Sequence, residues 1–521
     1  MSRADWRARA RTWLALGYRL GRRASGRLAR LPRRGREVVD RFDTWAYLDD
    51  LAATVSNRFA AAGVDHLVLD PDSSAMPRIA VARPDAARAV RALAGEATLW
   101  TAPLSHGLAG RPRPVARAGH GGDGLIVSRN LVSPSGTALT HGELGVTVEF
   151  WKPLLSPAAR PGGSEVPAGT LVAPGHNGVL DYLDAAQWQA AQRAGHRLPT
   201  PDPHLLVLNE PVDLVYTWVD GDDPEWRARK AAALDPGALA GYSSDADIEA
   251  RFADRQELRY SLRSVAMFAS WARRIWIVTD RQVPAWLRQD DRLRVVDHRE
   301  IFTDPDALPV FNSHAIESQL HHIDGLAERY LYLNDDMLFG APVRPEQFFH
   351  GNGISKLFTS HALIDPAPRS DDDIAVTAAA KNNRSLLEAS FGRTITSKLW
   401  HTPQPHSRSL MEQFEAEHPD IFDAVMRSRL RSVTDYSLTS SLDAYYAVAR
   451  GRAVPGRLQY GYLDLATSQP WVVLELWLAR RDLHCFCIND SGSDDPATRP
   501  AKDAALHEFF DAYFPVASPW E

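Results

Sequence analysis

Short apolar runs alternate with amphipathic segments through the second half of the chain. Four of these runs are rich in β-branched and aromatic residues and each is followed by aspartate, at 212–219, 275–278, 293–296 and 329–333. Apolar residues at helical spacing predict one helix over 254–268, with Asp254 as its cap, and another over 317–326. Strands that alternate with helices are typical of a parallel sheet with helices on both faces. We therefore expect an α/β fold with a Rossmann-like, mostly parallel, doubly wound sheet.

The first half of the chain has a different pattern, which predicts a smaller α+β domain over residues 41–200. The runs that predict strands or a helix in it lie at 65–70, 78–82, 84–93 and 145–151. Long Gly- and Pro-rich stretches between them are typical of loops. No catalytic constellation is recognisable in this region. Prolines recur before the first long apolar run, so we expect a linker at 201–211 and a second domain at 212–521.

Positive charge is concentrated in residues 1–40. This segment holds twelve arginines against three acids, with Trp and Leu between them. A basic amphipathic segment of this kind can lie on an anionic membrane surface. A disordered or solvated basic tail has the same composition. Both interpretations stay open, and the first implies peripheral contact with a membrane.

Composition narrows the class of protein. The chain has 521 residues, 45% of them hydrophobic and 24% charged, with a net charge of −6. This charge argues against nucleic acid as a partner. Only two cysteines are present, so no disulfide framework is expected and a reducing compartment fits. No apolar run reaches the length of a membrane span, and no secretory leader is recognised. We expect a cytoplasmic location, with the inner face of the plasma membrane as the peripheral alternative.

Aspartates at the ends of two strands are the strongest chemical signal. Asp220 ends the first run, and the adjacent Asp335 and Asp336 follow the last one. In an open α/β sheet, ligands bind outside the carboxyl ends of the strands, so these side chains are expected to converge. Carboxylate oxygens suit Mg or Mn and a diphosphate bound through it. For Asp280 and Asp297 ordinary turn chemistry is the preferred interpretation.

Two further groups are candidates for binding a nucleotide or its diphosphate. Arg259 and Arg263 are spaced by four with Arg255, so they share one face of the predicted helix. They could form a row of cations for a diphosphate, or simply a solvated helix face. The predicted floor of a nucleotide pocket consists of three consecutive residues, Tyr216, Thr217 and Trp218. Plain core packing is the alternative for Trp218.

These motifs belong to longer stretches that resemble the four signature blocks of the Stealth family. The first block is similar to residues 213–221, which read Asp-Leu-Val-Tyr-Thr-Trp-Val-Asp-Gly, and the second to stretches within 251–336 that end in Asn-Asp-Asp. The third resembles a His-x-Pro motif followed by Arg-x-x-x-Asp within 401–435, and the fourth resembles stretches within 487–515. All four occur in the family's order, and residues 1–211 lie outside the resemblance.

The family comprises hexose-1-phosphate transferases, among them bacterial capsule and exopolysaccharide phosphotransferases and the animal N-acetylglucosamine-1-phosphotransferase. The resemblance implies that a UDP-sugar donates hexose-1-phosphate to a sugar hydroxyl, so that UMP leaves and a phosphodiester forms. A metal-dependent glycosyltransferase that releases UDP is one alternative. A non-catalytic carbohydrate-binding or assembly protein is another. The expected partners are a nucleotide-sugar donor and a polysaccharide or glycan acceptor, and self-association into a homo-oligomer stays open.

The resemblance also assigns roles to particular residues. His401 is the first candidate for the general base, since a histidine with a near-neutral pKa suits that task. Asp336 is a rival base, and His406 is the second choice among the histidines. Arg431, with Asp435 four residues later, would neutralise charge on the phosphoryl oxygens. Residues of the fourth block expected to approach the metal are Asn489 and Asp490. The Ser/Gly/Pro-rich stretch 491–500 is expected to be a mobile loop or lid.

Overall fold

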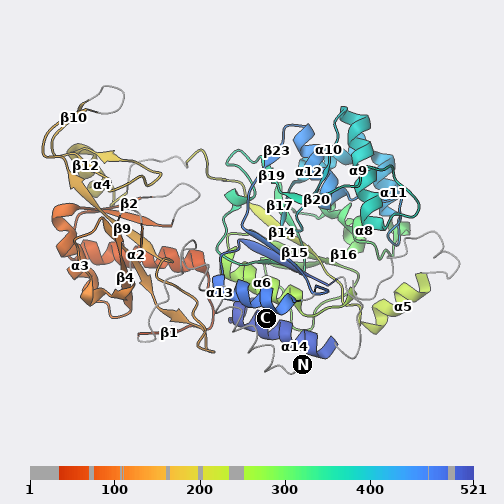
Figure 1. Ribbon diagram of the computed structural model, residues 1–521, viewed down its shortest axis with the longest axis horizontal. Coiled ribbons are helices and arrows are strands. Elements are labelled where there is room, and N and C mark those ends of the chain that lie inside the picture. Colours follow the sequence, from red (N-terminus) through yellow and green to blue (C-terminus); the bar gives the residue numbers. More distant parts are fainter. Residues whose placement is uncertain are drawn as a thin grey trace. The chain divides into compact units, whose positions relative to one another are not determined.

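The computed structural model describes residues 35–69, 76–105, 108–109, 111–159, 165–197, 204–233, 252–467, 469–490 and 499–521. It divides into two compact units, whose elements Figure 1 labels and colours along the sequence. The first unit contains residues up to Pro201 except 43–45, together with Ser468–Arg481, and the second contains the remainder. The basic segment predicted at 1–40 and the lid predicted at 491–500 lie almost wholly outside the described residues. Among the described helices, none combines the length and apolar character needed to cross a bilayer.

The first unit is built around a nine-stranded mixed sheet. Its main path runs β13-β12-β9-β7-β4-β5, while β3 pairs with β9 and β2, and β6 pairs with β4. The strands are β2 (His66–Leu69), β3 (Arg78–Ala82), β4 (Leu99–Ser105), β5 (Leu108–Ala109), β6 (Arg113–Pro114), β7 (Gly124–Arg129), β9 (Val146–Pro153), β12 (Leu171–Val172) and β13 (Tyr182–Leu183). The helices of this unit are α2 (Thr44–Ala61), α3 (Ala86–Ala94), α4 (Ala185–Arg193) and α13 (Pro470–Arg480).

Helix α4 shows how local sequence and packing agree in this unit. Asp184 accepts a hydrogen bond from the Gln187 backbone N–H at 2.8 Å, and Gln187 Oε1 accepts one from the Asp184 N–H at 3.1 Å. This reciprocal capping box satisfies two backbone donors at the start of the helix. Trp188 of α4 then packs in one apolar cluster with Leu67 and Trp151 of the sheet. The cluster is a core of its own, as expected of a separate folding unit.

The second unit contains a five-stranded sheet with the order β16-β15-β14-β17-β22. Its strands are β14 (Val212–Thr217), β15 (Ile275–Thr279), β16 (Leu293–Asp297), β17 (Arg329–Asn334) and β22 (Gln404–Ser407). All neighbours are parallel except β22, which runs antiparallel to β17. The predicted α/β class is confirmed. The chain passes from β14 to β15 and β16 on one side, then returns to β17 on the other, so the order reverses between β14 and β17. Such a switch point is where ligands bind in open α/β sheets.

Helices cover both faces of this sheet, which explains why its strands are apolar along their whole length. On one face, Val215, Trp276 and Tyr332 pack with residues of α8 (Ser313–Glu317) and α11 (Pro419–Met426). On the other face, the Tyr216 hydroxyl contacts the Ser261 hydroxyl of α6 (Glu257–Phe268) at 2.9 Å. Figure 1 shows α6 and α14 (Arg499–Tyr513) on one side of the sheet and α8 and α11 on the other.

The second unit also contains a three-stranded sheet with the order β18-β25-β24. Strand β18 (Met337–Phe339) directly follows Asp335 and Asp336, and pairs antiparallel with β25 (Cys485–Asn489). Strand β24 (Tyr460–Asp464) runs parallel to β25 on its other edge. The Ile488 N–H donates to the Asp336 carbonyl at 3.2 Å. The two carboxylates therefore lie in the short connection between two sheets, beside the end of β25.

Shorter elements complete the two units. Two-stranded ladders join β1 (Glu37–Val38) to β8 (Leu131–Val132), β10 (Ala158–Ala159) to β11 (Glu165–Val166), β19 (Ser355–Leu357) to β23 (Ala453–Pro455) and β20 (Thr359–Leu363) to β21 (Ser397–Leu399). The remaining α-helices are α5 (Pro224–Ala233), α7 (His298–Ile301), α9 (Ala375–Phe391), α10 (Arg408–Glu417) and α12 (Asp443–Ala449). Asp297 caps α7 through its side chain, in agreement with the turn chemistry expected there.

Candidate functional site

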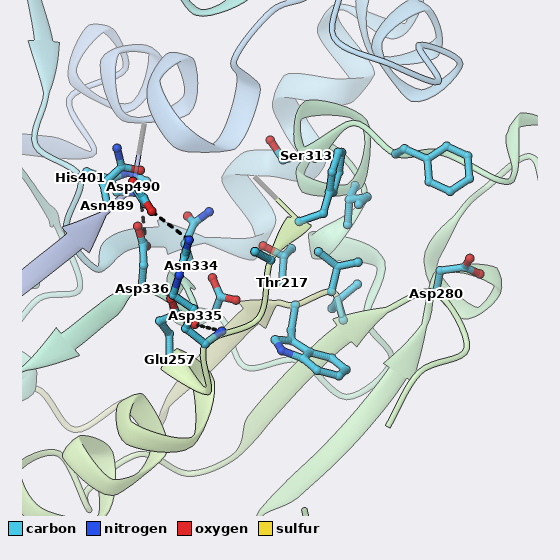
Figure 2. Close-up of a pocket in the computed structure, with 18 of the residues that line it drawn as sticks. Thr217, Glu257, Asp280, Ser313, Asn334, Asp335, Asp336, His401, Asn489 and Asp490 are labelled. Atoms are coloured by element: carbon cyan, nitrogen blue, oxygen red, sulfur yellow. Dashed lines mark hydrogen bonds and ion pairs between the residues drawn. The ribbon is translucent and has the colours of Figure 1, made fainter. Parts of the chain in front are cut away.

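A cleft of about 550 Å³ lies at the carboxyl ends of β14 and β17. Thr217 and Asn334, the last residues of these two strands, are partners in the sheet register and both line it. Figure 2 shows Asp336, His401, Asn489 and Asp490 grouped together, while Asp280 lies at a distance from them. Eight residues predicted from the sequence line this cleft: Thr217, Trp218, Asp335, Asp336, His401, Arg431, Asn489 and Asp490.

Carboxyl groups crowd one wall of the cleft. Burial raises the pKa of Asp335 well above its ordinary value, and the negative charges of Glu257, Asp336 and Asp254 raise it further. Burial and the charge of Asp254 likewise raise the pKa of Glu257, and Asp254 itself is shifted upward, mainly by burial. Buried carboxylates this close together repel one another. The wall is therefore a place where a bound cation would relieve a large unfavourable interaction.

His401 faces Asp336 across the cleft. Its Nε2 lies 3.5 Å from Asp336 Oδ1, and its side chain remains 39% exposed. Burial alone would lower the pKa of His401, but the negative charges of Asp336 and Glu317 raise it above its ordinary value. The Tyr460 hydroxyl donates to the His401 carbonyl at 2.8 Å, which fixes the loop that carries the imidazole. His401 is thus accessible, oriented and electrostatically coupled to a carboxylate.

Asp336 has two unlike environments at its two oxygens. Oδ2 accepts a hydrogen bond from the Cys487 thiol at 3.1 Å. Oδ1 is buried and makes no hydrogen bond within the described part of the chain, only the longer contact with His401. Burial and the charge of Asp336 raise the pKa of Cys487 well above its ordinary value, so the thiol stays protonated and can donate. Asp336, His401 and Cys487 together have the spacing of a group that could hold a metal ion.

Arg431 reaches the cleft because a loop is held by Asp435. The Arg431 guanidinium donates to the Ser313 hydroxyl, at the start of α8, at 2.8 Å. Asp435 Oδ2 accepts hydrogen bonds from the Asn312 amide at 2.8 Å and from the Ser432 backbone N–H at 3.1 Å. Asp435 is buried and lies outside the cleft lining. Its contacts place the arginine; they do not put the carboxylate in reach of a substrate.

Asp490, in the fourth signature block, is already paired with two cationic side chains. Asp490 Oδ2 accepts from the Arg255 guanidinium at 2.9 Å and from the Lys502 ammonium at 2.8 Å. Asn489 donates to Asp464 Oδ2 at 3.3 Å. With two cations on one carboxylate, Asp490 has little charge to offer a metal, and its expected place among the ligands is not supported. Its contacts position Arg255 in the cleft wall.

The predicted row of arginines is not brought into the cleft. Arg259 and Arg263 both bind the Glu521 carboxylate, through contacts of 2.6 Å and 2.7 Å respectively. Neither lines the cleft among the residues that the structure describes. Of the three arginines spaced by four, only Arg255 does, and it precedes the first turn of α6. We therefore withdraw the diphosphate role of Arg259 and Arg263.

His406 cannot serve as the base. Its side chain is fully buried, its Nδ1 contacts Asp443 Oδ2 at 2.6 Å, and its ring stacks on Tyr330 with centroids 5.1 Å apart. It lies on β22, within the sheet, and is outside the described lining of the cleft. A substrate hydroxyl cannot reach an imidazole in this position. The sequence could not exclude it because the two histidines flank the same pair of prolines, Pro403 and Pro405.

Tyr216 and Asp220, which were expected to contact a ligand, also lie outside the described cleft lining. Tyr216 is fully buried beneath the strand end and hydrogen-bonds Ser261 instead of facing a ligand. Asp220 Oδ1 accepts from the Asp222 backbone N–H at 2.9 Å, and its own N–H donates to Gln282 at 3.1 Å. Asp220 therefore organises the turn after β14, and its predicted role as a metal ligand is not supported by these contacts.

Several lining residues were not singled out for this site from the sequence. Glu257 falls within the helix expected at 254–268, which gave it no chemical role, yet its carboxylate belongs to the acidic wall. Asn334 and Ser313 also line the cleft. The signal for Asn334 was its position beside the aspartate pair at a strand end. The sequence carries no comparable signal for Glu257, because its burial depends on distant segments.

Comparison with known families bears on the same residues. Models of the four conserved regions of Stealth proteins match the chain: region 1 at residues 210–235, region 2 at 251–357, region 3 at 400–448 and region 4 at 477–521. Asp335 and Asp336 fall in the second region, His401 and Arg431 in the third and Cys487 in the fourth. Thr217 and Trp218 fall in the first, so the cleft draws on all four regions.

Similar proteins are found over most of the chain. An exopolysaccharide phosphotransferase of Streptomyces coelicolor is 40% identical over 500 residues, covering 91% of each chain. The exopolysaccharide phosphotransferase CpsY of Mycobacterium tuberculosis is 39% identical over 333 residues, covering 63% of this chain and 62% of its own. Among solved structures, the galactosyltransferase LgtC is 12% identical with a TM-score of 0.29, covering 58% of this chain and 96% of its own. At that score the likeness carries no weight for the chemistry.

Proposed function

Because this chain belongs to the Stealth family, we propose that it is a transferase that moves a sugar phosphate during exopolysaccharide synthesis. The relatives that cover most of its length are named exopolysaccharide phosphotransferases. The observation that carries the proposal is the meeting of His401, Asp336 and Arg431 in one cleft. Phosphoryl transfer needs a base for the acceptor and cations for the phosphate, and these residues supply both.

The donor in this proposal is a UDP-sugar and the acceptor is a sugar hydroxyl. The acceptor oxygen bonds to the β-phosphorus while the bond from that phosphorus to the UMP oxygen breaks. UMP leaves, and the product is a sugar phosphodiester. The cleft volume of about 550 Å³ lies within the range common for small-ligand sites. Thr217 and Trp218 are placed to contact the nucleotide at the strand end.

His401 takes the acceptor proton in this mechanism. Its side chain lines the cleft and its Nε2 lies near Asp336, whose charge stabilises the imidazolium that forms. Asp336 is the weaker candidate for the base, since one of its oxygens already accepts a hydrogen bond from the Cys487 thiol. Asp336 therefore acts on the proton transfer through His401. The residues that contact the acceptor and donor sugars determine which hexose is used.

Arg431 and Arg255 neutralise the charge that develops on the phosphoryl oxygens and on UMP. Both guanidiniums line the cleft and each is held by a polar partner, Ser313 for Arg431 and Asp490 for Arg255. Fixed cations cost no reorganisation when charge develops, so they favour the transition state. A guanidinium also fits phosphate oxygens with two parallel hydrogen bonds.

A divalent cation, Mg or Mn, fits the acidic wall. Asp335, Asp336 and Glu257 offer hard oxygen donors, and the buried Asp336 Oδ1 has no hydrogen bond among the described residues. When bound, the ion would supply positive charge to the diphosphate. The raised pKa values of Asp335 and Glu257 support this placement, because a cation would remove the repulsion that causes them.

The nucleotide released is the decisive measurement. Purified protein is incubated with a panel of UDP-hexoses, Mg or Mn and an oligosaccharide acceptor. We expect UMP, together with a phosphodiester signal in phosphorus NMR. Release of UDP would instead establish glycosyl transfer to the anomeric carbon. Binding of oligosaccharide without release of either nucleotide would favour the non-catalytic alternative.

We propose a domain division that follows the strand order: an α+β domain at 41–200, a linker at 201–211 and a Rossmann-like catalytic domain at 212–521. It is supported by the two compact units, with the difference that Ser468–Arg481 clusters with the first unit. Limited proteolysis with first cleavage between residues 198 and 211 would agree with it.

Peripheral membrane contact through residues 1–40 stays a prediction, and flotation with anionic vesicles before and after removal of those residues tests it.

A further inference from the structure

Away from the cleft, two adjacent histidines and a glutamate meet at one point. His321 and His322 belong to the 3-10 turn η6 (Leu320–His322), and Glu415 belongs to α10. The Nε2 atoms of His321 and His322 lie 2.8 Å and 2.9 Å from the same oxygen, Glu415 Oε2. None of the three residues is part of the described cleft lining. The arrangement is therefore a second cluster, separate from the proposed chemistry.

The hydrogen bonding of His322 determines what its other nitrogen can do. His322 Nδ1 lies 3.2 Å from the Ile301 carbonyl oxygen, which can only accept, so Nδ1 carries a proton. In the neutral ring, Nε2 then presents a lone pair toward Glu415. Two lone pairs at 2.9 Å repel, so either a proton or a metal ion must lie between His322 and the carboxylate.

A proton can fill this position, because the Glu415 carboxylate raises the pKa of His322, and a metal ion would compete with it for the same three groups. The His321 and His322 ring centroids are 4.0 Å apart, and the His321 side chain is fully buried. Its Nδ1 is buried with no hydrogen-bond partner in the described part of the chain. A protonated His322 and His321 can both donate to the same Glu415 oxygen, and His321 Nδ1 keeps no described partner in that state or in a metal-bound one. A single dication satisfies both Nε2 atoms and the carboxylate at once.

We propose that His321 Nε2, His322 Nε2 and a Glu415 oxygen form a binding site for a divalent transition metal, of which Zn²⁺ is the best fit. Two imidazoles and one carboxylate are a ligand set that zinc accepts, with water in a fourth position. The ligand atoms all lie within 4.8 Å of one another. The Ile301 carbonyl orients the His322 ring from behind, as the outer partners of metal-bound histidines do.

The geometry requires only a small adjustment. Zinc bonds of roughly 2.0–2.1 Å in a tetrahedral site place ligand atoms about 3.3 Å apart, so each Nε2 must move from Glu415 by about 0.5 Å. The His322 and Glu415 side chains are 22% and 26% exposed, which leaves room for this movement and for a water ligand. Glu412, one turn earlier on α10, adds negative charge that both histidines experience.

The site would tie together segments that are distant in sequence. Segment η6 follows α8, which carries Ser313 at the cleft, and α10 follows β22 at the edge of the main sheet. A metal held between them would stabilise this part of the second unit, since metal binding to the folded state adds to its stability. The proposal does not rest on the proposed function, and its test uses binding alone.

Zinc binding to the full chain tests the site. Metal-stripped protein is titrated against a chromophoric zinc chelator, as wild type and as His322→Gln, Glu415→Gln and the control His361→Gln, an exposed histidine on β20. Because Asp336, His401 and Cys487 could also hold zinc, the informative quantity is the difference between proteins. We expect each cluster variant to bind one equivalent fewer than wild type, or to bind it roughly 100-fold more weakly. The control should match wild type.

Equal stoichiometry and affinity in wild type and both cluster variants would overturn the proposal. If either variant fails to fold, zinc-edge X-ray absorption of a protein that keeps all three cluster residues decides the matter. A Cys487→Ser background removes the sulfur ligand of the cleft, and one equivalent of zinc is then added. Scattering from two imidazoles would support the site, and its absence would contradict it.

Discussion

His401 and Asp336 illustrate how much a single contact decides at the residue scale. Both were candidate bases from the sequence, and they prove to be neighbours, with Nε2 and Oδ1 3.5 Å apart. His401 is accessible, while Asp336 is partly buried and accepts a hydrogen bond from the Cys487 thiol. In the proposed mechanism the pair divides the task that the sequence could only assign to one or the other: His401 moves the proton and Asp336 stabilises the charged imidazole.

Replacing the base gives the first prediction. His401→Gln should lower kcat for UMP release by roughly 10²–10⁴, the usual contribution of a positioned base. The change should leave the thermal unfolding midpoint nearly unaltered, because the side chain is 39% exposed. His361→Gln serves as a matched control on an exposed strand. Activity within tenfold of wild type would remove His401 from the proton transfer.

Arg431 gives a second prediction at the same scale. Arg431→Gln should lower kcat/KM roughly 10²-fold, because it removes a fixed cation from the developing phosphate charge. Arg427→Gln, four residues earlier in the same region, is the control. Arg427 forms an exposed pair with Asp423, so its loss should have little effect on turnover. A similar loss in both variants would point to general electrostatics instead of a specific contact.

Helix α6 shows what decides the boundaries of an element. The predicted helix began at Asp254, but the observed one begins at Glu257, after Gln256 with a φ of 64°. Asp254 Oδ1 accepts from the Gln256 N–H at 2.8 Å, so Asp254 shapes the turn before the helix and does not cap it. This turn lets Arg255 and Glu257 enter the cleft wall, whereas Arg259 and Arg263, further along the helix, face Glu521.

The pairing of α6 with Glu521 leads to a stability prediction. Burial alone would raise the pKa of Glu521, but hydrogen bonds from Arg263 and Arg259 lower it to about 2. Glu521→Gln should therefore reduce the free energy of unfolding by about 2 kcal/mol at neutral pH. A carboxyl with a depressed folded-state pKa contributes fully above its unfolded value of about 4.3, and the contribution disappears as pH falls through about 2.

Urea denaturation of wild type and Glu521→Gln at several pH values measures this effect. The difference between the two proteins should be constant from pH 7 to about 5 and should shrink below about pH 4. A difference that does not change with pH would mean that packing around the side chain, and not its charge, accounts for the loss. The enzyme assay is not needed for this test.

At the scale of the whole molecule, the cleft depends on how two sheets meet. The aspartate pair lies between β17 of one sheet and β18 of the other, and β25 brings Cys487 and Asn489 beside it. His401 and Arg431 arrive from separate loops. A wall of carboxylates at such a junction is stable only if its charge is balanced, which is the reason for expecting a divalent cation there.

Removal of that cation is the fourth prediction. Exhaustive treatment with EDTA should abolish UMP release, and addition of Mg or Mn should restore it, because the acidic wall would otherwise repel the donor diphosphate. The Asp335→Asn variant should require a higher Mg concentration for half-maximal activity. Activity that survives complete chelation would exclude the metal from the reaction and leave Arg431 and Arg255 as the cations.

The sequence was informative wherever a property depends on neighbouring residues. The apolar runs at 212–219, 275–278, 293–296 and 329–333 correspond closely to β14, β15, β16 and β17, since buried parallel strands are apolar without interruption. The aspartates at their ends marked the correct edge of the sheet. The antiparallel partner β22 and the sheet β18-β25-β24 were not anticipated, because their pairing joins segments with no local periodicity in common.

By itself, the sequence determined the α/β class, the strand ends that line the cleft and membership of the family, all of which follow from local patterns. Only the tertiary structure decided which of several residues of the same type reach the cleft. His401 enters it and His406 does not, because Asp443 and Tyr330 enclose the latter. Arg255 enters it, while Glu521, more than 250 residues away, binds the next two arginines. Burial and charge pairing are set by such distant partners, and no local pattern records them.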